Sequence, residues 1–257
     1  MRRVRAASLV LVVFALLPLG SIRASWAWNL TGHRWIALDA LTVLPAPMKE
    51  ALTPHASLLL AGLLEPDFNR VVSHKIPIVS LRGTPRPPRS EAADTFKRFA
   101  VDAEAMIRLG RGLDEVAFVL GQATHFVQDL NQPLHGAWGE TRAEHHEVED
   151  QMLYRSWQKD HTYRGFMLIK DYSCFAQSIA EKSSRHARTL FFDRQIERVT
   201  GLAWDQAVND TASLWQSVFW RALGPERAWL VYGIPAPVGE AGSGSLSVSC
   251  ESSRPAG

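Results

Sequence analysis

The sequence has 257 residues, with 28 Lys and Arg against 26 Asp and Glu. Four of the arginines lie in the first 27 residues, which contain no acid, so the remaining chain carries 24 basic and 26 acidic residues. A chain this close to neutrality lacks the basic surface typical of proteins that bind duplex nucleic acid. Its length and ordinary apolar content predict one globular domain with a sizeable core.

Residues 1–27 have the pattern of a secretory signal peptide. A basic start precedes an apolar run over residues 6–19, and Ser25-Trp26-Ala27 places small residues at positions −3 and −1 before a cut after Ala27. The run is shorter than the ~20 residues that span a bilayer, which argues against a membrane anchor. We therefore expect a secreted or periplasmic protein that begins at Trp28 and has no transmembrane segment.

Apolar residues recur beyond residue 27 at three- and four-residue spacing, which predicts helices. The predicted helices cover residues 33–44, 58–64, 91–109, 113–130, 144–157, 172–190 and 200–223. Pro and Gly crowd residues 69–90, which are predicted to form a loop. No run of alternating residues argues for a sheet. The expected fold class is all-α, with a single compact helical domain over residues 28–233.

Pro, Gly and Ser dominate residues 234–257, which are predicted to form a flexible tail. The tail contains Cys250, and the only other cysteine is Cys174. The two could pair in an oxidising compartment, but the sequence does not fix the geometry.

Four tryptophans recur near helical spacing, and core packing is a better interpretation of them than a ligand groove. They are Trp204, Trp215, Trp220 and Trp229.

The helix predicted over residues 113–130 contains ionisable residues in its interior. One side carries an apolar stripe, and the opposite side, which includes His125 and Asp129, is not polar like a solvent-exposed face. Burying such groups is unfavourable unless something pairs with them. At i, i+4 spacing the two side chains could hydrogen-bond to each other or reach one metal ion. The helix alone leaves both interpretations open.

More histidines and carboxylates occur on both sides of this helix. The candidate ligands are His33, Asp67, His74, His125, Asp129, His135, His145 and Glu149, with His146 and Asp150 as an alternative pair. Imidazole and carboxylate without thiolate are the ligands of hydrolytic zinc sites. His55, His161 and His186 have no acidic partner at ligand spacing and are predicted to be surface or packing residues.

The segment His125-Phe-Val-Gln-Asp129-Leu-Asn-Gln-Pro133-Leu-His135 resembles the signature shared by zinc-dependent phospholipases C and the S1/P1 nucleases. That signature is His, three residues, Asp, then Gln-Pro-x-His, and the resemblance extends over most of residues 28–232. The mature chain in this superfamily begins with Trp, whose amino and carbonyl groups bind zinc. The predicted cleavage exposes Trp28, which agrees with this pattern.

The resemblance implies three zinc ions. One would be held by Asp67, His74, His125 and Asp129. A second would be held by the Trp28 terminus, His33 and Asp129, whose carboxylate bridges the two ions. The third would be held by His135, His145 and Glu149. The pair His145/Glu149 is preferred to His146/Asp150 because Val148 then occupies the apolar position that the family has before its acid.

The sequence departs from both branches of the superfamily. The phospholipase signature has Tyr after its first His, Gly or Thr before its Asp, and Asn near its end. This sequence has Phe126, Gln128 and Trp138 at those positions. Lys75 stands where the nucleases have an aromatic residue that stacks on a base. The short spacing from Trp28 to His33 is similar to that of the nucleases, whereas the pair His145/Glu149 is similar to that of the phospholipases. The substrate is therefore left open between phospholipid and single-stranded nucleic acid.

The expected function is zinc-dependent phosphodiester hydrolysis of the phospholipase C type. Asp67 would orient or deprotonate the attacking water. One alternative is a single-strand nuclease, and another is a secreted helical protein that binds zinc without turnover and leaves no coordination position open. The expected partner is a phospholipid or single-stranded nucleic acid as substrate. We expect a monomer without a stable nucleic-acid complex.

Overall fold

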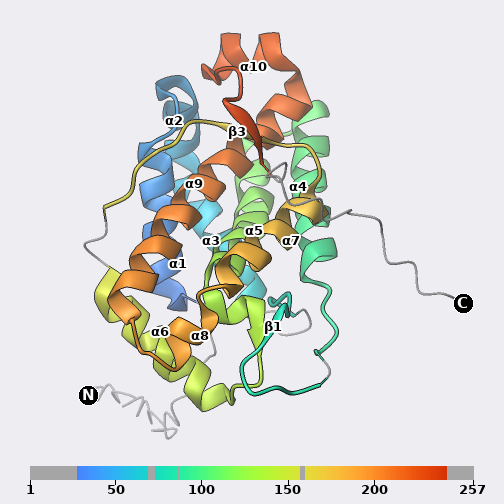
Figure 1. Ribbon diagram of the computed structural model, residues 1–257. Helices are drawn as coiled ribbons and strands as arrows, with labels where there is room; N and C mark the ends of the chain where they lie inside the picture. Colours follow the sequence, from blue (N-terminus) through green and yellow to red (C-terminus); the bar gives the residue numbers. More distant parts are fainter. Residues whose placement is uncertain (1–27, 69–72, 86, 157–159, 242–257) are drawn as a thin grey trace, which may run out of the picture.

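The computed structural model describes residues 28–68, 73–85, 87–156 and 160–241. The predicted signal peptide and Cys250 lie outside these residues. The described chain is a bundle of helices with two small pairs of strands (Figure 1), so the predicted all-α class is confirmed. The α-helices are α1 (Asn29–Thr42), α2 (Ala46–Leu52), α3 (Ala56–Phe68), α4 (Ala92–Arg108), α5 (Leu113–Asn131), α6 (Arg142–Ser156), α7 (Tyr172–Ser184), α8 (Ala187–Phe191), α9 (Ile196–Leu223) and α10 (Pro225–Tyr232). Two 3₁₀ turns are η1 (Thr53–His55) and η2 (Pro133–Gly136).

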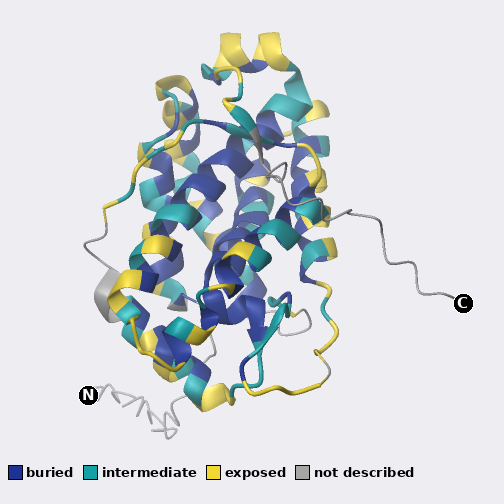
Figure 2. Cartoon of the chain, viewed as in Figure 1, coloured by how far each residue is buried: buried dark blue, intermediate teal, exposed yellow. Residues whose placement is uncertain are grey.

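Helix α5 is the central element of the bundle. It contacts α1, α3, α4, α7 and α9, and residues 123–131 are all buried, as the dark blue centre of Figure 2 shows. The helix ends at Asn131 because Pro133 restricts the preceding Gln132 to extended backbone, with φ −78° and ψ 120°. Its carboxyl-terminal turns are therefore enclosed on all sides, as the sequence predicts.

Glycines allow α3 to lie close against α5. A Cβ added to Gly62 would lie 1.9 Å from the carbonyl oxygen of Phe118, and one added to Gly121 would lie 2.1 Å from that of Leu59. No side chain fits at either position, because both obstacles are backbone atoms. This contact fixes the end of α3, which carries Asp67, beside the second half of α5.

The two strand pairs are short and parallel. β1 (Val79–Ser80) pairs with β2 (Ala137–Trp138), and β3 (Met167–Ile169) pairs with β4 (Gly239–Ala241). The sequence did not predict either pair, since strands of two or three residues are too short for an alternating pattern to be visible. β4 lies in the segment predicted to be a tail, and at residues 239–241 the structure therefore differs from that prediction.

The tryptophan prediction is correct only in part. Trp204 and Trp215 are buried in the core, but Trp229 on α10 is 59% exposed. Within the described residues, none of the helices is both long enough and apolar enough to cross a membrane.

Candidate metal centre

Histidines and carboxylates from five parts of the chain converge at the carboxyl-terminal end of α5. They come from α1, the end of α3, the loop before β1, η2 and α6. Among the described residues they form three adjoining groups, each with ligand atoms within 4.8 Å of one another. The groups are His33, His125 and Asp129; Asp67, His74 and His125; and His135, His145 and Glu149.

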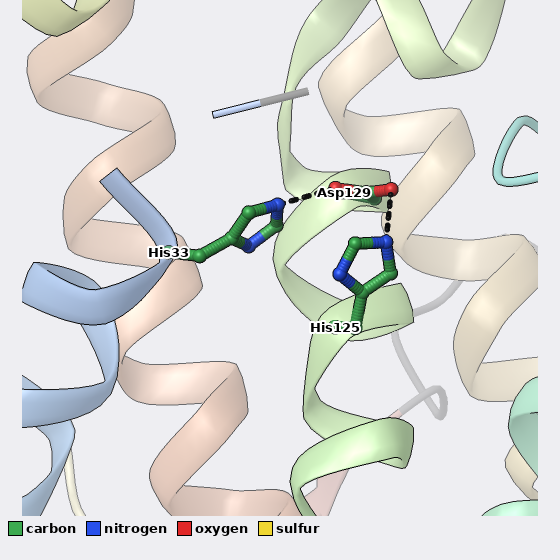
Figure 3. A group of neighbouring side chains, drawn as sticks. All are labelled: His33, His125 and Asp129. Carbon is green, nitrogen blue, oxygen red and sulfur yellow. Dashed lines mark ion pairs between the residues drawn. The ribbon is translucent and has the colours of Figure 1, made fainter. Parts of the chain in front are cut away.

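Asp129 lies between histidines from two helices, as Figure 3 shows. His33 Nε2 from α1 is 3.1 Å from Asp129 Oδ1, and His125 Nε2, one turn earlier on α5, is 3.1 Å from Oδ2. All three side chains are fully buried. The i, i+4 spacing on α5 therefore places His125 and Asp129 on one side of the helix, facing α1.

The loop before β1 brings His74 to the same place. Its backbone follows η2, with Ile76 N–H donating to His135 O and Ile78 N–H donating to Gly136 O, each at 2.9 Å. His74 Nδ1 is 3.2 Å from Asp129 Oδ2, 3.0 Å from His125 Nε2 and 3.7 Å from Asp67 Oδ1. The short stretch between Asp67 and His74 is thus long enough to place both beside α5.

The third group joins η2 to α6. His145 Nε2 is 2.7 Å from Glu149 Oε1, and His135 Nε2 is 3.3 Å from His145 Nε2. His145 and Glu149 are buried, whereas His146 is partly exposed and Asp150 is exposed. Of the two overlapping pairs on α6, His145/Glu149 is therefore the one that faces His135.

Most of these imidazoles are held by an acceptor on the ring nitrogen that faces away from the centre. His125 Nδ1 donates to Leu63 O at 2.9 Å, and His135 Nδ1 donates to His74 O at 3.1 Å. Because a carbonyl oxygen only accepts, the neutral rings keep Nε2 unprotonated and able to bind a metal. Backbone acceptors carry no side-chain signal, so the sequence could not reveal them.

Two side chains are the acceptors for the rings of His145 and His33. Glu140 Oε1 is 3.1 Å from His145 Nδ1, and Gln128 Oε1 is 2.8 Å from His33 Nδ1. Sequence reasoning missed both residues as functional. Glu140 precedes α6 and falls outside the helical spacing that identified its neighbours. Gln128 was noted only as a departure from the phospholipase signature, although its position directly before Asp129 was a usable signal.

Burial and charge shift the pKa values of the carboxylates in opposite directions. Burial alone would raise the pKa of Asp129, but the surrounding histidines, led by His125 and His135, hold it well below its usual range. Burial likewise opposes ionisation of Glu149, yet His145 and His135 keep its pKa far below normal. Burial raises the pKa of Asp67, so Asp67 is the most basic of these three carboxylates.

The carboxylates in turn shift the pKa values of the histidines. Burial acts to lower the pKa of His33 and of His74, but Asp129 outweighs it and raises both. Glu149 and Glu140 raise the pKa of His145 in the same way. Burial lowers the pKa of His135. The protein without metal thus balances buried anions with partly protonated imidazoles.

Several buried ligand atoms have no hydrogen-bond partner within the described residues. They are His33 Nε2, Asp67 Oδ2, His74 Nε2, both carboxylate oxygens of Asp129 and Glu149 Oε1. Buried polar atoms are normally satisfied, and a set of unsatisfied acceptors that face one another calls for a cation. Nitrogen and oxygen donors without sulfur suit zinc at a hydrolytic site. The residues present therefore fit the metal that the sequence predicts.

Trp28 lies at the edge of this centre. It is buried, precedes the first residue of α1, and donates from its indole Nε1 to the carbonyl oxygen of Gln128 at 2.7 Å. Its ring packs edge-on against Trp204, with centroids 5.9 Å apart. Residue 28 is thereby held beside the turn of α5 that carries Asp129.

A cavity of about 400 Å³ opens onto the centre. Its lining includes His74, His135 and His145 from the ligand groups, together with Ser73, Lys75, Glu140, Thr141 and Arg142. The three histidines predicted to be surface or packing residues belong to none of the groups: His55 pairs with Asp114, His161 lies 3.7 Å from Asp39, and His186 directly precedes α8.

The fold is similar to that of two solved bacterial toxins. Alpha-toxin of Clostridium perfringens, isolated from avian strain SWCP, aligns with a TM-score of 0.54 and 16% identity over 76% of this chain and 64% of that one. Alpha toxin from Clostridium absonum aligns with a TM-score of 0.53 and 16% identity over 72% and 64%. This chain therefore spans less than two thirds of either toxin, and at such identity the likeness establishes the fold alone.

Sequence comparison identifies the family. No curated protein sequence matches the chain. The family described as zinc dependent phospholipase C matches residues 32–218, which include every ligand candidate except Trp28. Since this match covers well over half of the sequence, the chain belongs to the zinc-dependent phospholipase C family.

Proposed function

We propose that this chain is a secreted, zinc-dependent phospholipase C that hydrolyses the phosphodiester bond of a phospholipid. The observation that carries the proposal is the set of three adjoining ligand groups, two of which have members in the lining of one cavity. Family membership supports phosphodiester hydrolysis. The structure of the described residues supports a compact catalytic domain without a membrane-spanning helix.

Three zinc ions would be held by the residues already described. The first would take Asp67, His74, His125 and Asp129. The second would take His33, Asp129 and the amino and carbonyl groups of Trp28. The third would take His135, His145 and Glu149. Zinc at such a site stabilises negative charge on phosphate oxygens and lowers the pKa of a bound water molecule.

The side chains of the protein have separate roles in this scheme. Asp67 orients the attacking water and accepts its proton at a carboxylate oxygen, a role suited to the carboxylate with the raised pKa. Asp129 stays ionised and holds the first two groups together through its two oxygens. His125 and His135 are fixed by backbone carbonyls, so the centre is arranged before the substrate arrives.

An assay on two substrates tests the proposal. Purified protein that begins at Trp28 is supplied with zinc and incubated with phosphatidylcholine or phosphatidylglycerol and, separately, with denatured DNA. We expect release of diacylglycerol and of the phosphorylated headgroup, with no release of nucleotides. Nucleotide release without lipid hydrolysis would replace the phospholipase proposal with a nuclease. Bound zinc with neither activity would indicate a non-catalytic zinc protein.

A further inference from the structure

We propose that the cavity beside the third ligand group selects phospholipids with an uncharged, hydroxyl-bearing headgroup, such as glycerol or inositol, over choline. This inference rests on the proposed phospholipase activity and assigns it a substrate class. The selecting residues are Lys75, Glu140 and Arg142, none of which belongs to the candidate metal ligands.

Cationic side chains outnumber anionic ones on the cavity wall. Lys75 Nζ contacts Glu140 and lies 3.2 Å from His145 Nδ1, and 29% of the lysine side chain remains exposed. Arg142 is exposed and lies 3.2 Å from His146 through its Nε. Phosphatidylglycerol and phosphatidylinositol carry an uncompensated negative phosphodiester, which this wall attracts. Choline brings its own fixed positive charge, which Lys75 and Arg142 repel.

Glu140 supplies a hydrogen-bond acceptor that only certain headgroups satisfy. Its side chain is 3% exposed, and Oε1 contacts Lys75 and His145, whereas the buried Oε2 has no hydrogen-bond partner in the described part of the chain. A hydroxyl group donates a hydrogen bond to such an oxygen, but a quaternary ammonium has no hydrogen to donate.

The cavity also lacks the surface that usually recognises choline. Quaternary ammonium groups bind against the faces of Trp, Tyr and Phe rings. None of the described residues that line this cavity is Trp, Tyr or Phe. Apart from the histidines, the lining side chains are hydroxyl-bearing or charged. Ser73 and Thr141 instead add hydroxyl groups that can bond to a polyol.

Monomeric short-chain lipids test the inference without the attraction of a charged membrane surface. The kcat/KM of the zinc-loaded protein is measured for short-chain phosphatidylglycerol and phosphatidylcholine below their micelle concentrations. We expect a preference of about tenfold or more for the glycerol headgroup, since one hydrogen bond to a charged group is worth at least that factor. The double variant Lys75→Gln/Arg142→Gln should lower this ratio without abolishing it, partly by improving phosphatidylcholine hydrolysis, because the acceptor on Glu140 remains.

The ratio separates headgroup selection from support of the metal centre. A variant that only weakened zinc binding would lower both rates and leave the ratio unchanged, so zinc content is measured alongside. Lys49→Gln/Arg111→Gln is the matched control, because both residues are exposed and lie outside the cavity. The control should retain the wild-type ratio.

The possible failures are distinguishable. Equal or better hydrolysis of phosphatidylcholine by the wild-type protein overturns the headgroup inference and leaves the phospholipase function standing. A ratio that the double variant leaves unchanged overturns the assignment to Lys75 and Arg142. Hydrolysis of neither lipid overturns the proposed function and this inference together.

Discussion

Asp129 is the carboxylate on which histidines from four parts of the chain converge. Its two oxygens lie 3.1–3.2 Å from nitrogens of His33, His125 and His74, and His135 Nδ1 is 3.7 Å away. Neither oxygen has a hydrogen-bond partner within the described residues. Asp129 therefore contacts histidines of more than one ligand group, whereas His145 contacts only His135 and Glu149 among the ligand candidates.

We expect Asp129→Asn to release more zinc than His145→Ala. The amide loses the negative charge that offsets two cations, so metal analysis should show about two zinc equivalents missing, against about one for His145→Ala. His146→Ala is the matched control on α6, since its ring is partly exposed outside the three groups. Equal losses from the Asp129 and His145 variants would show that Asp129 does not bridge.

Glu140 should act on zinc only through His145. Glu140→Gln removes the negative charge that orients the His145 imidazole and favours a proton on its Nδ1. We expect zinc affinity at one site to fall about 10–100-fold, the usual effect of losing such a supporting carboxylate. Competition with a chelator measures this affinity. Glu144→Gln is the control, because Glu144 contacts Arg82 and Thr141 at the surface instead. A similar loss in the control would remove the assigned role.

Sequence reasoning identified the residues that carry an i, i+4 signal or belong to the shared signature. His125/Asp129 and His145/Glu149 are visible because helical spacing repeats along the chain. Glu140 and the carbonyl of Leu63 are not visible, because their positions depend on how α6 and α3 pack against the rest. Residues that support the ligands thus depend on tertiary contacts that no local pattern contains.

At the level of elements, the contact between α3 and α5 sets the distance between Asp67 and His125. Gly121→Ala places a methyl group 2.1 Å from Leu59 O, so the two helices must move apart. We expect destabilisation of about 1–3 kcal/mol or more, as for other overpacked cores, together with loss of zinc. Denaturant unfolding and metal analysis test both effects.

Gly112→Ala is the matched control for this contact. Gly112 precedes α5 at φ −60°, and an added Cβ meets nothing within 4 Å. Its free energy of unfolding and zinc content should stay close to those of the wild-type protein. A Gly121 variant as stable as this control would mean that α3 and α5 tolerate a wider separation.

The long helices were predictable because they combine apolar periodicity with terminating Gly or Pro. α2 and α10 were missed because seven or eight residues show too few turns for a period to emerge. The predicted helix over residues 172–190 is two helices, α7 and α8, separated by Arg185 and His186, and the larger departure from helical dihedrals is at His186, with φ −96° and ψ −5°. No Pro or Gly marks that break in the sequence.

For the whole molecule, zinc and pH should act together on stability. Without metal, the pKa values of His33, His74 and His145 are raised. Their protonation favours the folded state below the unfolded pKa of ~6.5, and this contribution is lost as pH rises through the raised values. Zinc requires unprotonated imidazole, so its contribution grows with pH.

The increase in Tm on adding zinc to chelator-treated protein should therefore be larger at about pH 7.5 than at about pH 5.5. Chelation should also abolish hydrolysis, and zinc should restore it. Thermal unfolding at both pH values with and without zinc measures the first effect. An increase in Tm that is the same at both pH values, or full activity in excess chelator, would contradict the zinc assignment.

The amino group of Trp28 provides a test of maturation. Protein made without residues 1–27 but with a Met retained before Trp28 should fold and be largely inactive, because an amide nitrogen is a poor metal ligand. Removal of that Met should restore zinc content and kcat/KM. Trp28→Phe with an exposed terminus should keep zinc but lose about 1 kcal/mol of stability, since the indole bond to Gln128 is lost. Equal activity with and without the extra Met would exclude the terminal ligand.

The position of the ligands along the chain also affects the path of folding. All of them lie between residues 28 and 149, whereas α7 and α9, which complete the enclosure of α5, come later. Histidines and carboxylates of an unfolded chain also bind metal ions, in combinations that the native packing does not allow. A nascent chain that captured zinc early would hold its first half in mispaired loops. We therefore expect α9 to collapse onto α5 before the metals bind, so that the scaffold selects the ligand sets.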